Sequence, residues 1–231
     1  MLRDTWLMAV KDLRIEFSSR VVTSQILPFG LLVLILFGLA ISPDLRVVGD
    51  GQRSVLEEIA PGLFWLAVVL SALMALSRAF SIEANDGNLD ALRMAGIDPA
   101  GVFLGKAMAV TVQLVAIEIV LGLGTVVIFG TPLANPLLLV ATLFLANFAI
   151  ALAGTMYAAL ASGLRSRDTL VPLLVLPVLA PVLLGATLAT RDALFDDPGV
   201  PGWSWAMLLA VFSLLYLGVG MLAFGPLLEE T

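Results

Sequence analysis

The sequence predicts an all-α membrane protein with six transmembrane helices, and its composition and the spacing of its apolar residues carry this prediction. Of the 231 residues, 60% are hydrophobic and only 13% are charged, whereas soluble domains are about 45–50% apolar. The apolar residues gather in six stretches, each long enough for the roughly 20 helical residues that cross a bilayer. Lipid cannot satisfy exposed backbone groups, so each stretch is expected to be a helix. We therefore expect one transmembrane domain that covers residues 1–231.

The expected spans differ in length and in how regular they are. They cover Val21–Ile41, Ala60–Phe80, Val102–Gly130, Pro136–Ala161, Leu170–Thr190 and Trp203–Pro226. Within the third, Gly122 and Gly124 predict a local break in the helix, because glycine is a poor helix former. The loop Ser42–Ile59 is long enough to hold a short helix of its own over Ser54–Ile59.

Residues 1–20 predict an amphipathic helix that lies in the membrane interface before the first span. Trp6, Val10, Leu13 and Phe17 recur at helical spacing and fall on one face, which is typical of such helices. The alternative is a short cytoplasmic extension of the first span. We expect no cleavable signal peptide, because charged residues of both signs crowd this segment and the apolar run that follows is too long.

The distribution of basic residues predicts that both termini face the cytoplasm of a bacterial inner membrane. With the N-terminus inside, the inner segments hold nine basic residues, namely Arg3, Lys11, Arg14, Arg20, Arg78, Arg93, Lys106, Arg165 and Arg167. The outer segments then hold three, Arg46, Arg53 and Arg191. Cytoplasmic segments carry the excess of Lys and Arg, so nine against three favours this orientation. Six spans bring the C-terminus back to the same side.

The chain lacks the residues that several classes of activity need. The chain has no Cys and no His, which removes thiolate chemistry, imidazole acid–base catalysis and the commonest metal and haem ligands. The net charge of −6 gives no basic footprint for nucleic acid. No G-x-x-x-x-G-K-[ST] loop, H-E-x-x-H or G-x-S-x-G motif occurs. We therefore expect no catalytic residue, no metal and no directly bound cofactor, and ATP could act only through a partner.

The first inner loop, residues 81–101, predicts a short amphipathic helix. Asn85-Asp86-Gly87 is a turn signal, and the side chain of Asn88 can cap the first turn of a helix. Leu89, Leu92 and Arg93 then share one face. Such a helix has two uses, either resting on the membrane surface or docking into a groove on a soluble partner. The pattern by itself favours neither.

Glu118 is the one carboxylate deep inside a predicted span. It follows Lys106 by twelve residues, or ~18 Å along a helix, which places it near the middle of the membrane. A charge there is costly, so an intramembrane acid is a candidate for a role in transport. The alternative is a protonated side chain that hydrogen-bonds Thr125, Asn147 or Gln113. An intramembrane enzyme that uses Glu118 is a further hypothesis, but the sequence supplies no evident catalytic partner.

The fifth predicted span contains three prolines, Pro172, Pro177 and Pro181. Each removes a helical N–H and crowds the carbonyl four residues earlier, so they predict a kinked or partly broken helix. Membranes tolerate this where neighbouring protein or a wet cavity satisfies the carbonyls. The span is therefore either a bending element beside a substrate path or a helix kinked by packing.

Small residues recur every four positions on the second span, at Ala67, Ser71, Ala75 and Ala79. Such a ridge lets another helix approach closely, either within the chain or across a subunit interface. Gly101 and Gly105 begin a similar ridge at the base of the third span.

The chain resembles the CcmB family, also called haem exporter protein B. The resemblance rests on Ile59-Ala60-Pro61-Gly62-Leu63-Phe64-Trp65, on Asp86-Gly87-Asn88-Leu89, on Gly163-Leu164-Arg165 and on the segment from Val175 to Pro181. It covers nearly the whole chain, and its Ile-Ala-Pro-Gly and Leu-Pro-x-x-x-Pro elements are specific in combination. Glu118 and the Gly122/Gly124 pair lie outside it.

The resemblance implies a type-2 ABC exporter membrane subunit for cytochrome c maturation. It assigns the coupling helix, which contacts a separate CcmA-like ATPase, to Gly87, Asn88, Leu89, Leu92 and Arg93, and so favours partner docking over the membrane surface. It implies CcmC-like and CcmD-like membrane partners and release of a haem-loaded chaperone, CcmE. The complex, rather than this chain, would handle haem. The alternative function is a general type-2 ABC permease for a lipid, a drug or a polysaccharide.

Overall fold

The computed structural model describes residues 1–41, 46–47, 50–85, 98–162, 167–196, 199 and 201–230. Six of the helices in these ranges are long and apolar enough to cross a membrane. The elements are α1 (Leu2–Ser19), η1 (Val22–Ile26), α2 (Leu27–Ala40), β1 (Arg46–Val47), β2 (Asp50–Ser54), α3 (Val55–Asn85), α5 (Pro99–Phe129), α6 (Pro136–Ser162), α7 (Arg167–Phe195) and α8 (Gly202–Glu230). The predicted six-span, all-α architecture is confirmed, with one short strand pair added.

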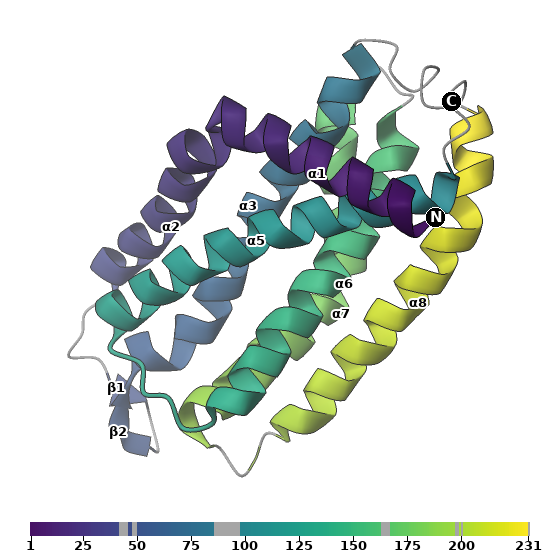
Figure 1. Ribbon diagram of the computed structural model, residues 1–231. Helices are drawn as coiled ribbons and strands as arrows, with labels where there is room; N and C mark the ends of the chain where they lie inside the picture. The colour runs from purple at the N-terminus through teal and green to yellow at the C-terminus, as the bar shows by residue number, and fades with distance from the viewer. Residues whose placement is uncertain are drawn as a thin grey trace.

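The long helices form a bundle with α1 across one end (Figure 1). Both termini lie at that end, and the β1–β2 pair lies at the other. The core sits along α3, where Trp65, Ala67, Val68, Ala72 and Leu76 are fully buried. An even number of spans brings the two termini to the same side, as the sequence predicted.

The amphipathic helix at the N-terminus is separate from the first span. α1 ends at Ser19, and Arg20 adopts a left-handed conformation with φ 55° that turns the chain into η1 and α2. Trp6 and Phe17, from the predicted apolar stripe, are 64% and 76% exposed. The face that packs on the bundle holds Met8 and Ala9 instead. The alternative of a simple extension of the first span is therefore wrong.

The second span starts earlier than predicted because its N-terminal end is capped. The Ser54 hydroxyl accepts the Glu57 N–H at 3.1 Å, while the Glu57 carboxylate accepts the Ser54 N–H at 3.4 Å. This reciprocal pair is a capping box, which stabilises a helix start by satisfying first-turn donors. α3 consequently begins at Val55. The separate short helix predicted over Ser54–Ile59 is the first part of α3, and the strand pair precedes it.

The third span does not break at its glycines. α5 is continuous through Gly122 and Gly124, so the predicted interruption is wrong. A Cβ atom on Gly124 would lie 3.1 Å from the Leu31 side chain of α2. The glycine therefore serves a close approach between helices, and the surrounding α5 residues keep the helix intact.

The fifth span is likewise continuous, although it contains three prolines. α7 runs from Arg167 to Phe195 through Pro172, Pro177 and Pro181, so a partly broken helix is not what forms. Pro177 and Pro181 are exposed on the outer surface of the bundle. Pro172 lines a groove of about 450 Å³ together with residues of η1 and α3.

The small-residue ridge of α3 packs inside the chain. Ala67, Ser71 and Ala75 are buried. A Cβ atom on Gly30 of α2 would lie 3.0 Å from the Ser71 hydroxyl oxygen, so α2 crosses close to α3 there. Ala75 and Ala79 line a gap of only about 20 Å³ beside α1 and α5. Of the two alternatives for this ridge, a helix contact within the chain or a subunit interface, the structure supports the contact within the chain.

Candidate functional site

The candidate site is a cluster of charged side chains where α1 crosses the base of α3 and α5. Its formation depends on close contact between α1 and α5. A Cβ atom on Gly105 would lie 2.5 Å from the Met8 Cβ and 2.7 Å from the Thr5 carbonyl oxygen. Side chains larger than hydrogen would push the helices apart, so the Gly101/Gly105 ridge is the surface on which α1 rests.

Lys106 is the most buried charged residue of the cluster, with a side chain only 1% exposed. Its Nζ donates to Asp12 Oδ2 of α1 at 3.2 Å and to the Ala79 carbonyl of α3 at 3.2 Å. A buried ammonium is costly unless it is paired and hydrogen-bonded. One side chain therefore joins α5 to both α1 and α3.

Arg78 and Glu16 make a second link one turn farther along α1. Arg78 Nε of α3 donates to Glu16 Oε2 at 3.2 Å, and the Glu16 side chain is 11% exposed. The other carboxylate oxygen of Glu16 accepts the backbone N–H of Val22 at 3.0 Å. Glu16 therefore joins the end of α1 to α3 and to the start of η1.

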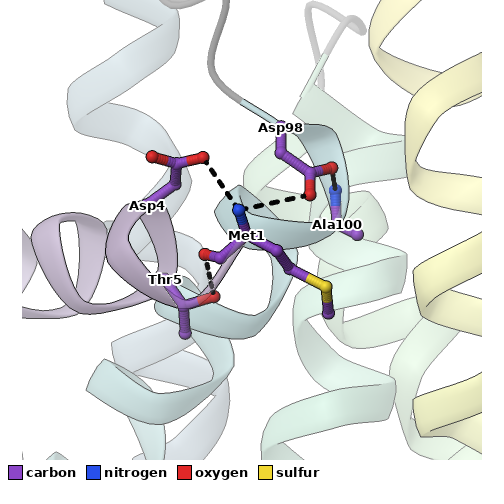
Figure 2. A network of polar contacts seen from close by, with 5 residues as sticks. All are labelled: Met1, Asp4, Thr5, Asp98 and Ala100. Atoms are coloured by element: carbon purple, nitrogen blue, oxygen red, sulfur yellow. Dashed lines mark hydrogen bonds and ion pairs between the residues drawn. The ribbon is translucent and has the colours of Figure 1, made fainter.

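A third set of contacts fixes the start of α5 (Figure 2). Asp98 caps α5 by accepting the Ala100 N–H at 3.1 Å. Its second oxygen lies 3.7 Å from the α-amino nitrogen of Met1, which also donates to Asp4 at 3.3 Å. The Thr5 hydroxyl donates to the Met1 carbonyl at 3.1 Å. The first turn of α1 is thus tied to the first turn of α5.

The cluster brackets the inner loop in which the sequence places the coupling helix. Arg78 lies about two turns before Asn85, and Lys106 about two turns after Asp98. Asn85 and Asp98 are the described residues that border the loop. The predicted coupling residues Gly87, Asn88, Leu89, Leu92 and Arg93 lie outside the described residues. Their role remains a prediction.

Glu118, for which the sequence offered Thr125, Asn147 or Gln113 as hydrogen-bond partners, lies against Asn147 where α5 packs on α6. Asn147 Nδ2 donates to Glu118 Oε2 and to the Thr111 carbonyl, both at 3.3 Å. Glu118 is 6% exposed and Asn147 is fully buried. Of the partners considered from the sequence, Thr125 bonds the Leu121 carbonyl instead.

An amide is not a proton-transfer group, so the Glu118–Asn147 pair supplies a helix contact rather than an acid–base couple. Glu118 Oε1 and Asn147 Oδ1 make no hydrogen bond within the described part of the chain. Across these same ranges no group of three His, Cys, Asp or Glu residues could hold a metal ion. The hypothesis of an intramembrane enzyme therefore gains no support from the neighbourhood of Glu118.

Sequence reasoning missed the ion pairs of the candidate site, although it counted their basic members, Arg78 and Lys106, as topology signals. Asp12 and Glu16 are spaced four residues apart on α1, away from its apolar stripe. Lys106 lies inside an otherwise apolar stretch. Together these features could have indicated that the acids of α1 neutralise a lysine at the start of the third span.

The fold and this cluster define a multi-pass α-helical membrane protein whose N-terminal helix is locked to the two spans that flank an inner loop. A family model described as CcmB protein matches residues 3–230. The chain belongs to the CcmB family.

Relatives in several bacteria are named Heme exporter protein B. The protein of Paracoccus denitrificans (strain Pd 1222) is 32% identical over 83% of this chain and 84% of its own length. That of Rhodobacter capsulatus is 33% identical over 79% of this chain and 81% of its own length. The Pseudomonas aeruginosa protein is 26% identical over 90% of each chain. The similarity thus extends over most of the spans in all three.

Proposed function

We propose that this chain is the membrane subunit of an ABC-type complex for cytochrome c maturation and that it performs no catalysis itself. A separate CcmA-like ATPase would bind and hydrolyse ATP. The chain would pass the resulting motion to a complex that also holds CcmC-like and CcmD-like membrane subunits and releases the haem-loaded chaperone CcmE. Family membership and the name carried by the relatives, Heme exporter protein B, support this proposal.

The observation that carries the proposal is the attachment of α1 to both flanks of the inner loop. Lys106 of α5 bonds Asp12, and Arg78 of α3 bonds Glu16. A partner that moved the loop would displace the ends of α3 and α5. Because α1 is bound to both helices, it would move with them, and Glu16 would carry the motion to η1 through its bond to Val22.

The proposed setting is the bacterial inner membrane, with both termini in the cytoplasm. Nine basic residues on the side of the termini against three on the other side support this orientation. It places the charged cluster and the inner loop where a cytoplasmic ATPase can reach them. It also lets the exposed Trp6 and Phe17 of α1 contact the lipid interface.

The coupling role is tested with substitutions in the inner loop. We expect Leu89→Asp and Arg93→Glu to reduce co-purification of the ATPase and covalently bound haem in membranes, because a docking helix needs its apolar face and its charge. Arg14→Glu is the matched control, since Arg14 is an exposed arginine of α1. Normal co-purification and normal c-type cytochromes in both loop variants would show that the coupling assignment is wrong.

The pathway itself is tested by deleting the gene and staining membranes for covalently bound haem. Loss of all c-type cytochromes, restored by the wild-type gene, would support the maturation role. Unchanged c-type cytochromes in a strain with no second copy would refute it. The general exporter of a lipid, a drug or a polysaccharide would then become the function to test.

A further inference from the structure

A groove of about 550 Å³ lies between the end of α1, η1 and α5. On the α5 side it is lined by Val112, Ala116 and Val120, which recur every four residues along one face. Phe17 and Leu27 line the opposite side. Ligand pockets in proteins span about 300–1,000 Å³, so the groove is large enough for a small amphipathic molecule.

The polar end of the groove is formed by an unusual turn at Arg20. Arg20 occupies the left-handed region with φ 55°, which is uncommon for a long side chain and needs support from its surroundings. Its carbonyl accepts the Ser24 N–H at 2.9 Å and the Thr23 hydroxyl at 2.9 Å. The turn places an exposed guanidinium where α1 meets η1. The π-helix that follows is a rare form that is often found at functional sites.

The charges around this end favour an anion. Glu16 also lines the groove, but its carboxylate already accepts from Arg78 and from the Val22 N–H. Arg20 therefore supplies a positive charge at the mouth beside a carboxylate that is already neutralised. Arginine binds phosphate well, because its planar group can donate two parallel hydrogen bonds.

We propose that this groove binds one anionic phospholipid from the leaflet that contains α1. The phosphate would lie at Arg20, and an acyl chain would run along Val112, Ala116 and Val120. Val112 is 46% exposed and Phe17 76% exposed, so the groove opens sideways to lipid and a chain can enter from the bilayer.

Haem is the other amphipathic anion to consider, and the lining disfavours it. The groove is lined by aliphatic side chains, Phe17, Glu16, Gln113, Thr23 and Arg20. None of these is a His, Cys, Met or Tyr, the side chains that commonly ligate haem iron. A phospholipid needs only a cation for its phosphate and an apolar wall for its chain, and the groove provides both. The inference is independent of the cytochrome maturation role.

Native mass spectrometry of the full-length chain, purified in detergent with equal amounts of phosphatidylglycerol and phosphatidylethanolamine, tests the proposal. We expect the wild type to retain one phosphatidylglycerol with a preference of about fivefold, which is the effect of one arginine near the surface. Arg20→Asn should abolish the preference, while asparagine still tolerates the left-handed turn. Arg14→Asn, which changes an exposed arginine outside the groove, should keep it.

Ala116→Trp fills the groove and tests the site of the acyl chain. We expect it to lose the retained phosphatidylglycerol, whereas Ala180→Trp, at an exposed alanine of α7, should retain it. Equal retention of both lipids by all variants would indicate lipids bound at the general surface and would overturn the proposal. Binding of added hemin that is lost in Ala116→Trp, with phosphatidylglycerol unaffected, would also overturn it. Circular dichroism of each variant confirms that the helices are intact.

Discussion

The ion pair between Lys106 and Asp12 offers the sharpest test of how α1 is held. Asp12→Asn replaces the carboxylate that lies 3.2 Å from the ammonium of Lys106 by a neutral amide, while the Lys106 side chain stays 1% exposed and keeps its other contacts, among them the Ala79 carbonyl. Lys106→Met removes the charge instead and keeps most of the apolar stem. Asp12 then retains Lys11, whose Nζ lies 3.2 Å from its other oxygen. The two substitutions therefore differ in what they leave buried.

The expected energies follow from this difference. Removing one member of a buried ion pair costs about 3–5 kcal/mol, chiefly because the remaining charge stays buried. Asp12 is 13% exposed, so we expect the lower end for Asp12→Asn, about 3 kcal/mol or a 150-fold change in the unfolding constant. Lys106→Met should cost about 1 kcal/mol, the contribution of a typical hydrogen bond.

The assay is the free energy of unfolding in mixed micelles, measured by titration with sodium dodecyl sulfate and followed by circular dichroism. The double variant Asp12→Asn/Lys106→Met carries neither charge of this pair, so we expect it to be as stable as Lys106→Met alone. A double variant no more stable than Asp12→Asn would refute the reasoning, as would a loss below about 0.5 kcal/mol in Asp12→Asn.

Two further substitutions test the helix contacts. Gly105→Ala places a Cβ atom 2.5 Å from the Met8 Cβ, so we expect it to lower the free energy of unfolding by about 1–3 kcal/mol. The control Gly218→Ala, whose added Cβ meets nothing within 4 Å, should be neutral or stabilising. Equal effects of the two substitutions would contradict the close approach of α1 and α5. Glu118→Gln keeps an oxygen that can accept a hydrogen bond from Asn147, so its covalent haem staining and its free energy of unfolding should match those of the wild type. A variant that is equally stable but shows no covalent haem staining would reveal a role for the carboxylate.

Hydropathy predicted the spans well because a segment that crosses the lipid must be helical and largely apolar. Where helices continue beyond the apolar stretch, the prediction fell short. α3 starts at Val55 because Ser54 and Glu57 cap each other. At its C-terminal end α7 reaches Phe195, and Arg191 of its last turns pairs with Glu58 at 2.6 Å.

The contacts between residues far apart in the sequence were the part of the candidate site that was harder to predict. Small residues at Gly101 and Gly105 predicted a close helix contact, but a ridge carries no information about which helix it meets. Lys106 and Asp12 are 94 residues apart, and no local pattern links them. For Glu118 the sequence offered a choice of polar partners, and only the packing of α5 against α6 selected Asn147.

The distance along the chain between Lys106 and Asp12 also imposes an order on biosynthesis. α1 leaves the ribosome 94 residues before the lysine that it binds. During that interval Asp12 lacks its partner Lys106, and the exposed apolar side chains of α1, such as Trp6 and Phe17, can keep the helix at the membrane surface. Docking of α1 can therefore be completed only after the second and third spans are in place. α1 is made before the two helices that it binds, and it is among the last elements to reach its final position.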